Sequence, residues 1–256
     1  MLIPSPRHTK ADLALWRELE EADRIHATSA RYREKVAESL AVLRAFALHG
    51  PCYAGMSGGK DSMVLAHLCA CLGVEGVTIP LVYVQAVPHA NPENELVLAA
   101  FERQFPDAPV TRFQADYTAI ARGLSSDDIE KEKDRIFFAA CRRIGAEVAP
   151  RRVLGIRASE SRVRKIRMLR HGFSTENTCA PLGWWSVADV FGYLAKHNLP
   201  VHPTYGMLGG GRWRRESLRV DEIGGLRGTE FGRAEWEREY YGDVVRRLEC
   251  GSRIGG

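Results

Sequence analysis

Short runs of apolar residues alternate with stretches of helical periodicity from Cys52 onward, and this alternation limits the folds open to the chain. The runs that we predict as strands cover residues 52–56, 77–84, 110–113 and 152–156. The helical stretches cover residues 62–73, 92–105, 127–145 and 186–198. Residues 77–84 are largely β-branched and nearly continuous in apolar character, as strands buried on both faces of a parallel sheet are. The pattern predicts an α/β, Rossmann-like fold in which helices cover both faces of a twisted parallel sheet.

The two ends of the chain depart from this alternation. Residues 10–49 show helical periodicity that Gly50 and Pro51 end, so residues 1–50 are predicted to form a helical N-terminal extension. The sheet domain is expected over residues 51–205. Residues 206–256 are predicted as a Gly/Arg-rich loop followed by a helix over 233–248. Within them, residues 209–215 are expected to form a mobile basic loop, with a plain linker as the alternative.

Composition excludes several classes of protein. Hydrophobic residues make up 45% and charged residues 27% of the 256 residues, which argues against general disorder. No run approaches the roughly 18 apolar residues that a membrane helix needs, and the N-terminus lacks the apolar run of a signal peptide. We therefore expect a cytoplasmic protein with no membrane partner. The six cysteines form no Cys-x-x-Cys pair and the eight histidines no His-x-x-x-His pair, so no zinc site is expected.

One glycine-rich segment, Ser57-Gly58-Gly59-Lys60-Asp61-Ser62, follows the first predicted strand and opens a helix. The glycines allow a tight turn and a close approach to a phosphate, while the helix N-terminus favours an anion. Lys60 and the two serine hydroxyls add donors. A Walker A loop is excluded, because that motif needs glycine where Ala54 stands and Ser or Thr where Asp61 stands.

This hexapeptide matches the Ser-Gly-Gly-x-Asp-Ser pyrophosphate loop of the N-type ATP pyrophosphatases, in the adenine nucleotide alpha hydrolase-like superfamily. From Cys52 to Tyr205 the chain resembles the phosphoadenosine phosphosulfate (PAPS) reductase family of that superfamily. Four further matches follow in the family's order: Pro92-Glu93, the Gly155-to-Arg162 segment, the Pro181-to-Val190 segment, and Leu199-Pro200 running to Pro203-Thr204-Tyr205.

The resemblance implies that ATP is cleaved between its α- and β-phosphates. Ser57, Gly58, Gly59, Lys60 and Ser62 would then hold pyrophosphate as the leaving group, and Lys60 and Asp61 would be catalytic. Asp61 would also place Mg²⁺, because a carboxylate together with phosphate oxygens suits that ion. The adenylylated acceptor would next be attacked by a second nucleophile, often a sulfur donor.

Arginines are concentrated after the fourth predicted strand. Of 36 basic residues 29 are arginine, and nine of these lie between Arg142 and Arg170. Arg157, Arg162 and Arg164 follow a strand end, where open α/β sheets bind ligands, so we predict that they hold a substrate phosphate or sulfate. A solvated basic helix is the alternative. Trp184 and Trp185 could stack on a base, although packing is expected for at least one of them.

The chain departs from the PAPS reductases at three places. Those enzymes generally lack the intact loop, and they end in Glu-Cys-Gly-Leu-His, whereas Glu249-Cys250-Gly251 is followed here by Ser252-Arg253. Cys250 is therefore a candidate catalytic thiol with half of the motif. Paired adjacent cysteines are absent, so no iron–sulfur cluster is expected. Residues 84–89 replace the family's Asp-Thr-Gly, which leaves the adenine and ribose contacts open.

Three functions follow from these observations. The first is an ATP pyrophosphatase that adenylylates an acceptor for sulfur transfer, into nucleic acid by thiolation or DNA phosphorothioation, with a sulfur-donor protein as partner. The second is a PAPS reductase that uses thioredoxin and Cys250. The third is a non-catalytic module that binds nucleotides or nucleic acid. The helical extension could also serve a homodimer contact.

Overall fold

The computed structural model describes residues 1–118, 120, 124–220, 222–224 and 232–251. Five parallel strands form its sheet in the order β3-β2-β1-β4-β5. These strands are β1 (Cys52–Met56), β2 (Leu81–Val87), β3 (Val110–Asp116), β4 (Arg151–Val153) and β5 (Thr178–Cys179). The larger helices are α1 (Lys10–His26), α2 (Ala30–Leu48), α3 (Lys60–Val74), α4 (Asn94–Gln104), α5 (Ser126–Glu147), α6 (Arg162–His171), α7 (Val187–Lys196) and α8 (Arg233–Gly251).

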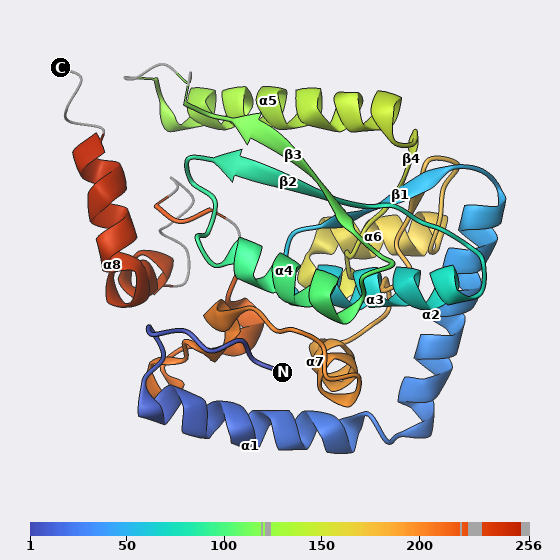
Figure 1. The fold of residues 1–256 in the computed structure, drawn as a ribbon, viewed down its shortest axis with the longest axis horizontal. Helices are drawn as coiled ribbons and strands as arrows, with labels where there is room; N and C mark the ends of the chain where they lie inside the picture. The colour runs from blue at the N-terminus through green and yellow to red at the C-terminus, as the bar shows by residue number, and fades with distance from the viewer. Residues whose placement is uncertain (119, 121–123, 221, 225–231, 252–256) are drawn as a thin grey trace.

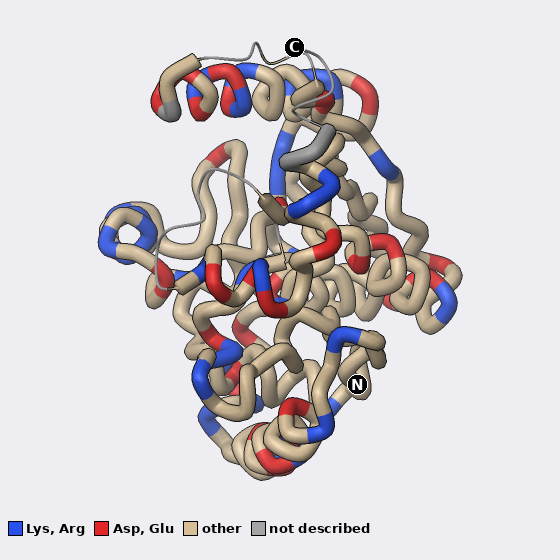
Figure 2. The backbone as a smooth tube through the Cα atoms, turned by 90° about the vertical axis from the view of Figure 1, so that its left-hand side faces the viewer, with Lys and Arg blue, Asp and Glu red and all other residues tan. Residues whose placement is uncertain are grey.

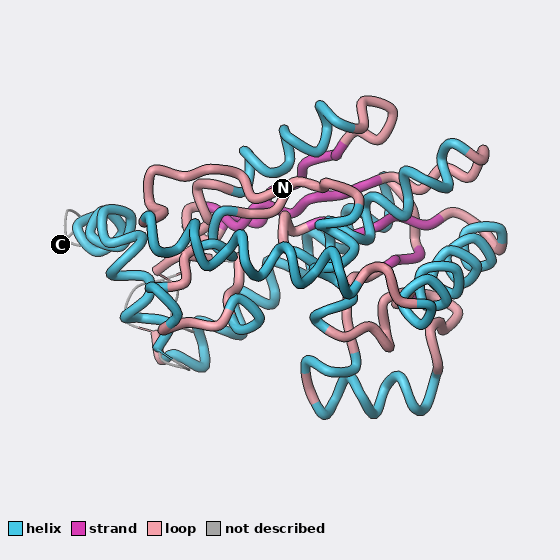
Figure 3. Tube along the Cα trace, turned by 90° about the horizontal axis from the view of Figure 1, so that it is seen from below, coloured by secondary structure: helices cyan, strands magenta, loops and turns pink. Residues whose placement is uncertain are grey.

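The predicted α/β fold with a parallel sheet is confirmed, and helices cover both faces of the sheet (Figure 1). The apolar side chains of α3 and α4 pack on one face, where Leu65 and Leu98 are fully buried. On the other face, Ile144 of α5 packs against Tyr53 and Phe113. Figure 3 shows the strands inside the molecule with helices on either side. Within the described residues no helix is long and apolar enough to cross a membrane.

Several element boundaries differ from the predicted ones. β2 begins at Leu81 rather than at residue 77, directly after Pro80, which has no N–H to give to a sheet. β4 ends at Val153 rather than at residue 156, because the chain turns there toward α3. The sequence also gave no prediction of β5, since a two-residue strand is too short to show a period.

The N-terminal extension is built onto the sheet domain rather than standing apart from it. α1 lies alongside α7 (Figure 1), and the Ile3 amide donates to the Val201 carbonyl at 2.9 Å. The buried Asp12 carboxylate accepts the Leu208 amide at 3.1 Å and the Tyr240 hydroxyl at 2.9 Å. Residues at both ends of the chain therefore meet at one carboxylate.

The prediction of a mobile loop at residues 209–215 is wrong. The segment forms short 3-10 turns, η3 (Gly209–Gly211) and η4 (Arg215–Ser217), separated by three residues. The Gly209 amide donates to the Tyr240 hydroxyl at 2.7 Å. Arg215 makes a bidentate ion pair with Asp23 at 2.6 and 2.7 Å, and both residues are buried. Releasing the loop would leave Asp23 without its partner, which is costly for a buried charge.

Candidate nucleotide-binding site

The glycine-rich loop joins the carboxyl end of β1 to the first turn of α3, as predicted. Gly58 has a φ of +75°, a left-handed conformation that glycine adopts without strain. The Ser57 amide donates to Ser62 Oγ at 3.1 Å, and that hydroxyl donates to the Gly59 carbonyl at 2.9 Å. These two bonds fix the loop so that the amino end of α3, with its partial positive charge, follows it directly.

Arg157 reaches the loop from the segment after β4. β1 and β4 are adjacent strands whose connecting helices leave in opposite directions, and ligands bind at such a switch point in open α/β sheets. A Cβ atom on Gly155 would lie 3.1 Å from the carbonyl carbon and oxygen of Asp61, so only glycine fits this approach. Arg157 Nε then lies 2.5 Å from Asp61 Oδ1.

Lys60, Asp61 and Arg157 form a buried cluster of two cations about one carboxylate. Lys60 Nζ lies 3.1 Å from Asp61 Oδ2, on the side opposite Arg157. Their exposed fractions are 7%, 9% and 2%. Burial alone would lower the pKa of Lys60, but Tyr205 and Asp61 oppose it and leave that pKa raised. Lys60 therefore carries a positive charge at the loop at neutral pH.

Tyr205, which the sequence offered only as part of a motif, contacts the loop from the opposite side. Its hydroxyl accepts the Lys60 amide at 3.1 Å, and its ring lies 5.4 Å from the Lys60 ammonium. A Cβ atom on Gly59 would lie 3.3 Å from this hydroxyl and 3.2 Å from Val220 Cγ2. Tyr205 and Val220 thus require glycine at position 59. The only signal for Tyr205 was its place in Pro203-Thr204-Tyr205.

Asn94, at the start of α4, was missed as well. It is 5% exposed, and its Nδ2 donates to the Tyr83 hydroxyl at 3.0 Å. Its Oδ1 is buried and has no hydrogen-bond partner among the described residues, and it would lie 3.6 Å from a Cβ atom on Gly58. An unpaired buried acceptor is costly unless a ligand satisfies it. Pro92-Glu93 marked this helix start without indicating the asparagine that follows.

The structure does not bring the remaining predicted residues to the loop. Arg162 and Arg164 lie on α6, where Arg164 pairs with Glu160, and no described hydrogen bond joins either to residues 57–62. Trp185 is buried and donates to Ser39 Oγ at 2.9 Å, which confirms packing for one tryptophan, while Trp184 is 40% exposed. The side chain of Cys250 lies outside the described residues.

The donor set at the loop fits magnesium in one respect. No group of three or more His, Cys, Asp or Glu residues that could hold a metal occurs among the described side chains. Magnesium, however, is often held by one or two carboxylates together with substrate phosphates. Each Asp61 oxygen contacts one cation, and a carboxylate oxygen offers two lone pairs. Asp61 can therefore serve as one protein ligand beside its cations.

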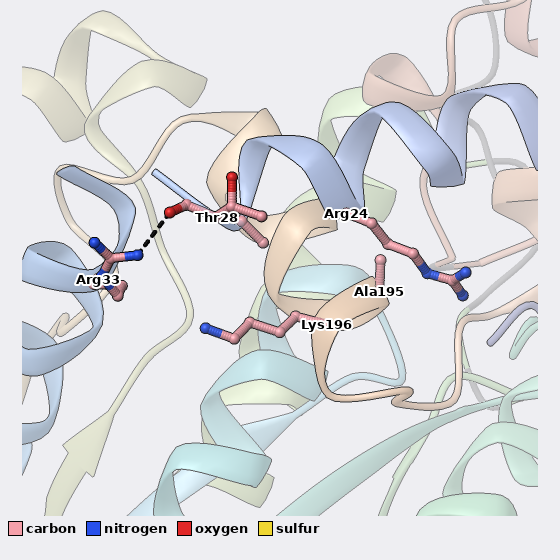
Figure 4. Close-up of a pocket in the computed structure, with 6 residues that line it drawn as sticks. Arg24, Thr28, Arg33, Ala195 and Lys196 are labelled. Carbon is pink, nitrogen blue, oxygen red and sulfur yellow. Dashed lines mark hydrogen bonds between the residues drawn. The ribbon is translucent and has the colours of Figure 1, made fainter. Parts of the chain in front are cut away.

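Two cavities of the described structure lie away from the loop. One, of about 400 Å³, is lined by Arg24, Arg33 and Lys196 near the ends of α1, α2 and α7 (Figure 4). Its cations have internal partners: Arg33 donates to the Thr28 carbonyl at 2.7 Å, and Lys196 lies 5.3 Å from the Tyr32 ring. A second cavity, of about 430 Å³, lies between α5 and the start of β4.

Solved structures with a similar arrangement include three enzymes. PAPS reductase from Candida auris, in a phosphate complex, is 15% identical, with 64% of this chain and 82% of that chain covered at a TM-score of 0.44. U34-tRNA thiolase from Methanococcus maripaludis is 14% identical, with 88% and 79% covered at 0.49. NMN synthetase from Francisella tularensis is 12% identical, with 66% and 71% covered at 0.48.

No curated protein matches the chain. The family model of the phosphoadenosine phosphosulfate reductase domain matches residues 51–208, which include the loop, Arg157 and Tyr205. This match covers more than half of the chain and confirms the resemblance noted in the sequence. The chain belongs to the phosphoadenosine phosphosulfate reductase domain family.

Proposed function

We propose that the protein cleaves ATP between the α- and β-phosphates and transfers the adenylyl group to an acceptor, which is thereby prepared for sulfur transfer. The observation that carries this proposal is the buried cluster of Lys60, Asp61 and Arg157 at the amino end of α3. The intact loop places a lysine, a helix N-terminus and a carboxylate where one triphosphate can meet all three. A site that only bound nucleic acid would need no such buried set.

The chemistry follows from how charge moves. An acceptor oxygen attacks the α-phosphorus, the bond from that phosphorus to the bridging oxygen breaks, and its electron pair leaves with pyrophosphate. The acceptor's proton passes to solvent. Negative charge therefore grows on the leaving group, where Lys60 and the helix amides stabilise it. AMP then becomes the leaving group when a sulfur donor attacks the adenylylated acceptor.

Arg157 and Asp61 have coupled roles in this scheme. Magnesium bound to Asp61 and to phosphate oxygens would supply charge neutralisation. A cation at Asp61 weakens the hold of that carboxylate on Arg157, and the guanidinium is then free to contact a phosphate bidentately. The same residue thus stabilises the empty loop and binds the loaded one.

The test incubates the full chain with ATP, magnesium and candidate acceptors, and separates the products by anion exchange. AMP and pyrophosphate are expected, and Asp61→Ala and Lys60→Ala should abolish both. Lys131→Ala is the matched control, because Lys131 is exposed on α5 and pairs only with Asp128. ADP and phosphate that disappear with Asp61→Ala would contradict the proposal.

The same preparation separates the reductase alternative. With PAPS and reduced thioredoxin, a reductase would release sulfite, and Cys250→Ser would stop it. Sulfite release with no pyrophosphate from ATP would replace the adenylyl transfer proposed here. Sulfite absent from both proteins, together with pyrophosphate release, would support it.

A further inference from the structure

We propose that the surface running from α6 to the cavity beside α5 binds a single-stranded segment of nucleic acid. This inference rests on the proposed function, because it names nucleic acid as the class of acceptor that is adenylylated. It is carried by three observations on one face of the molecule: unpaired cations, exposed apolar side chains, and a basic cavity with an exposed aromatic ring at its rim.

These parts share one face of the sheet. Tyr53, Arg152 and Thr178 occupy paired positions on β1, β4 and β5, so their side chains point to the same side. Tyr53 packs with Ile144 of α5 on that side. Arg167 of α6 donates to Thr178 Oγ1 at 2.8 Å, which places α6 beside the same face. The cavity and α6 are therefore neighbouring parts of one surface.

The exposed side of α6 is cationic and apolar at once. The helix carries four arginines and one lysine and no acidic residue. Arg162, Lys165 and Arg170 form no ion pair within the described chain. Its exposed aliphatic side chains are Val163, Ile166 and Leu169, at 76%, 53% and 69% exposure. Such a helix suits an anionic partner that also offers apolar faces, and unstacked bases on a phosphate backbone provide both.

The cavity supplies a seat for a base. It has a volume of about 430 Å³, and Tyr53, Phe138, Arg142 and Arg152 are among its lining residues. Phe138 is 51% exposed, although a phenylalanine on a helix of this fold would normally be buried. Neither arginine has a carboxylate partner in the described part of the chain. An exposed ring between two arginines is the arrangement by which proteins stack bases and hold their phosphates.

Topology connects this seat to the ATP site. α6 begins at Arg162, five residues after Arg157, at the carboxyl edge of the sheet. Because β4 and β5 are parallel, the segment between them must return to the amino edge, where Arg152 and the cavity lie. The cations of α6 therefore line the way from the loop to the cavity. A strand lying along them would place one nucleotide at Phe138 and another beside the ATP site.

The test measures binding by fluorescence anisotropy with the full chain. The probes are labelled single-stranded DNA and RNA of about 12 nucleotides and one sequence, with the matching DNA duplex. We expect the single strands to bind more tightly than the duplex. We also expect binding to weaken at least about tenfold from about 50 to about 200 mM salt.

Variants of exposed residues locate the surface. Phe138→Ala should weaken single-strand binding by about fivefold or more, and Phe138→Trp should restore it. Arg162→Glu with Arg170→Glu should flatten the salt dependence, by about 0.7 in logarithmic slope per lost contact. Arg103→Glu, an exposed residue of α4, is the matched control and should change nothing. A strand containing bromodeoxyuridine should crosslink to the tryptic peptide of residues 136–142.

The outcomes separate this inference from the proposed function. Single-strand binding that ignores both Phe138→Ala and the α6 reversals would overturn the inference, as would no binding at low salt. Pyrophosphate released with a protein acceptor, and not with either strand, would overturn it while leaving adenylyl transfer intact. Strand binding with the expected variant effects and no AMP from ATP would refute adenylyl transfer but keep this surface.

Discussion

Asp61 is the residue whose surroundings most limit what the loop can do. Its carboxylate holds a cation on each side, and both cations come from segments expected at the site. Removing the carboxylate would leave Lys60 and Arg157 facing each other within a buried cluster. Asp61 therefore keeps two phosphate-binding cations close together when no phosphate is present.

Arg157 offers a direct measure of this arrangement. Arg157→Ala should lower the free energy of unfolding by about 3 kcal/mol, because one partner of a buried pair is lost. Combined with Asp61→Asn, its effect should shrink, since the carboxylate no longer needs the guanidinium. A double-mutant cycle in urea should give a coupling energy of about 1 kcal/mol or more. Additive effects would show that the two side chains do not stabilise each other.

Asn94 has a buried oxygen that ATP can satisfy. Asn94→Ala should raise KM for ATP by roughly 5- to 10-fold with kcat little changed, because one ground-state hydrogen bond is lost. Tyr83→Phe is the control, since it removes the partner of Nδ2 and leaves Oδ1 in place. Steady-state kinetics of pyrophosphate release measure both. Equal KM changes in the two variants would assign Asn94 a packing role only.

At the scale of elements, the segment after β4 is aligned by its contact with α3. Gly155→Ala should destabilise the protein by about 1 to 3 kcal/mol, because its Cβ would press on the Asp61 backbone. Gly73→Ala is a matched control: it lies in α3 and its Cβ would meet nothing within 4 Å. That substitution should be neutral or stabilise by up to about 1 kcal/mol. Equal thermal midpoints for both variants would contradict this account.

Local pattern explains which elements the sequence could predict. The loop, β1 and α3 are contiguous, so their residues carry both the strand-to-helix change and the motif. The bond of Arg157 to Asp61 joins residues 96 positions apart, and that of Tyr205 to Lys60 joins residues 145 apart. No periodicity records such contacts. Likewise the arginines of residues 209–215 suggested solvent, because the partner of Arg215 is Asp23 in a distant helix.

On the scale of the whole molecule, the ends of the chain close around the sheet domain. Asp189 of α7 binds both His26 of α1 and Lys35 of α2, at 2.9 and 2.5 Å. Tyr240 of α8 meets Asp12 of α1. Acidic and basic residues are spread along the chain rather than gathered at one end (Figure 2), and several of these distant pairs are buried. The extension and α8 should therefore unfold together with the sheet domain.

Buried neutral histidines then make the stability of the whole fold depend on pH. Burial lowers the pKa of His67 to about 4 and that of His202 to about 3. The unfolded chain takes up these protons near pH 6.5, whereas the folded chain does not. As pH falls below about 6.5, each histidine should therefore remove on the order of 1.4 kcal/mol of stability per pH unit.

Urea unfolding at about pH 7, 6 and 5 tests this dependence, because carboxylates such as Asp189 titrate only at lower pH. His67→Gln should unfold more easily at pH 7, since the contact of His67 Nδ1 with the Tyr193 hydroxyl at 2.8 Å is altered. It should nevertheless lose less stability between pH 7 and 5 than the parent, because one titrating group is gone. A parent protein equally stable at pH 7 and 5 would mean that both histidines accept protons within the fold, which their burial argues against.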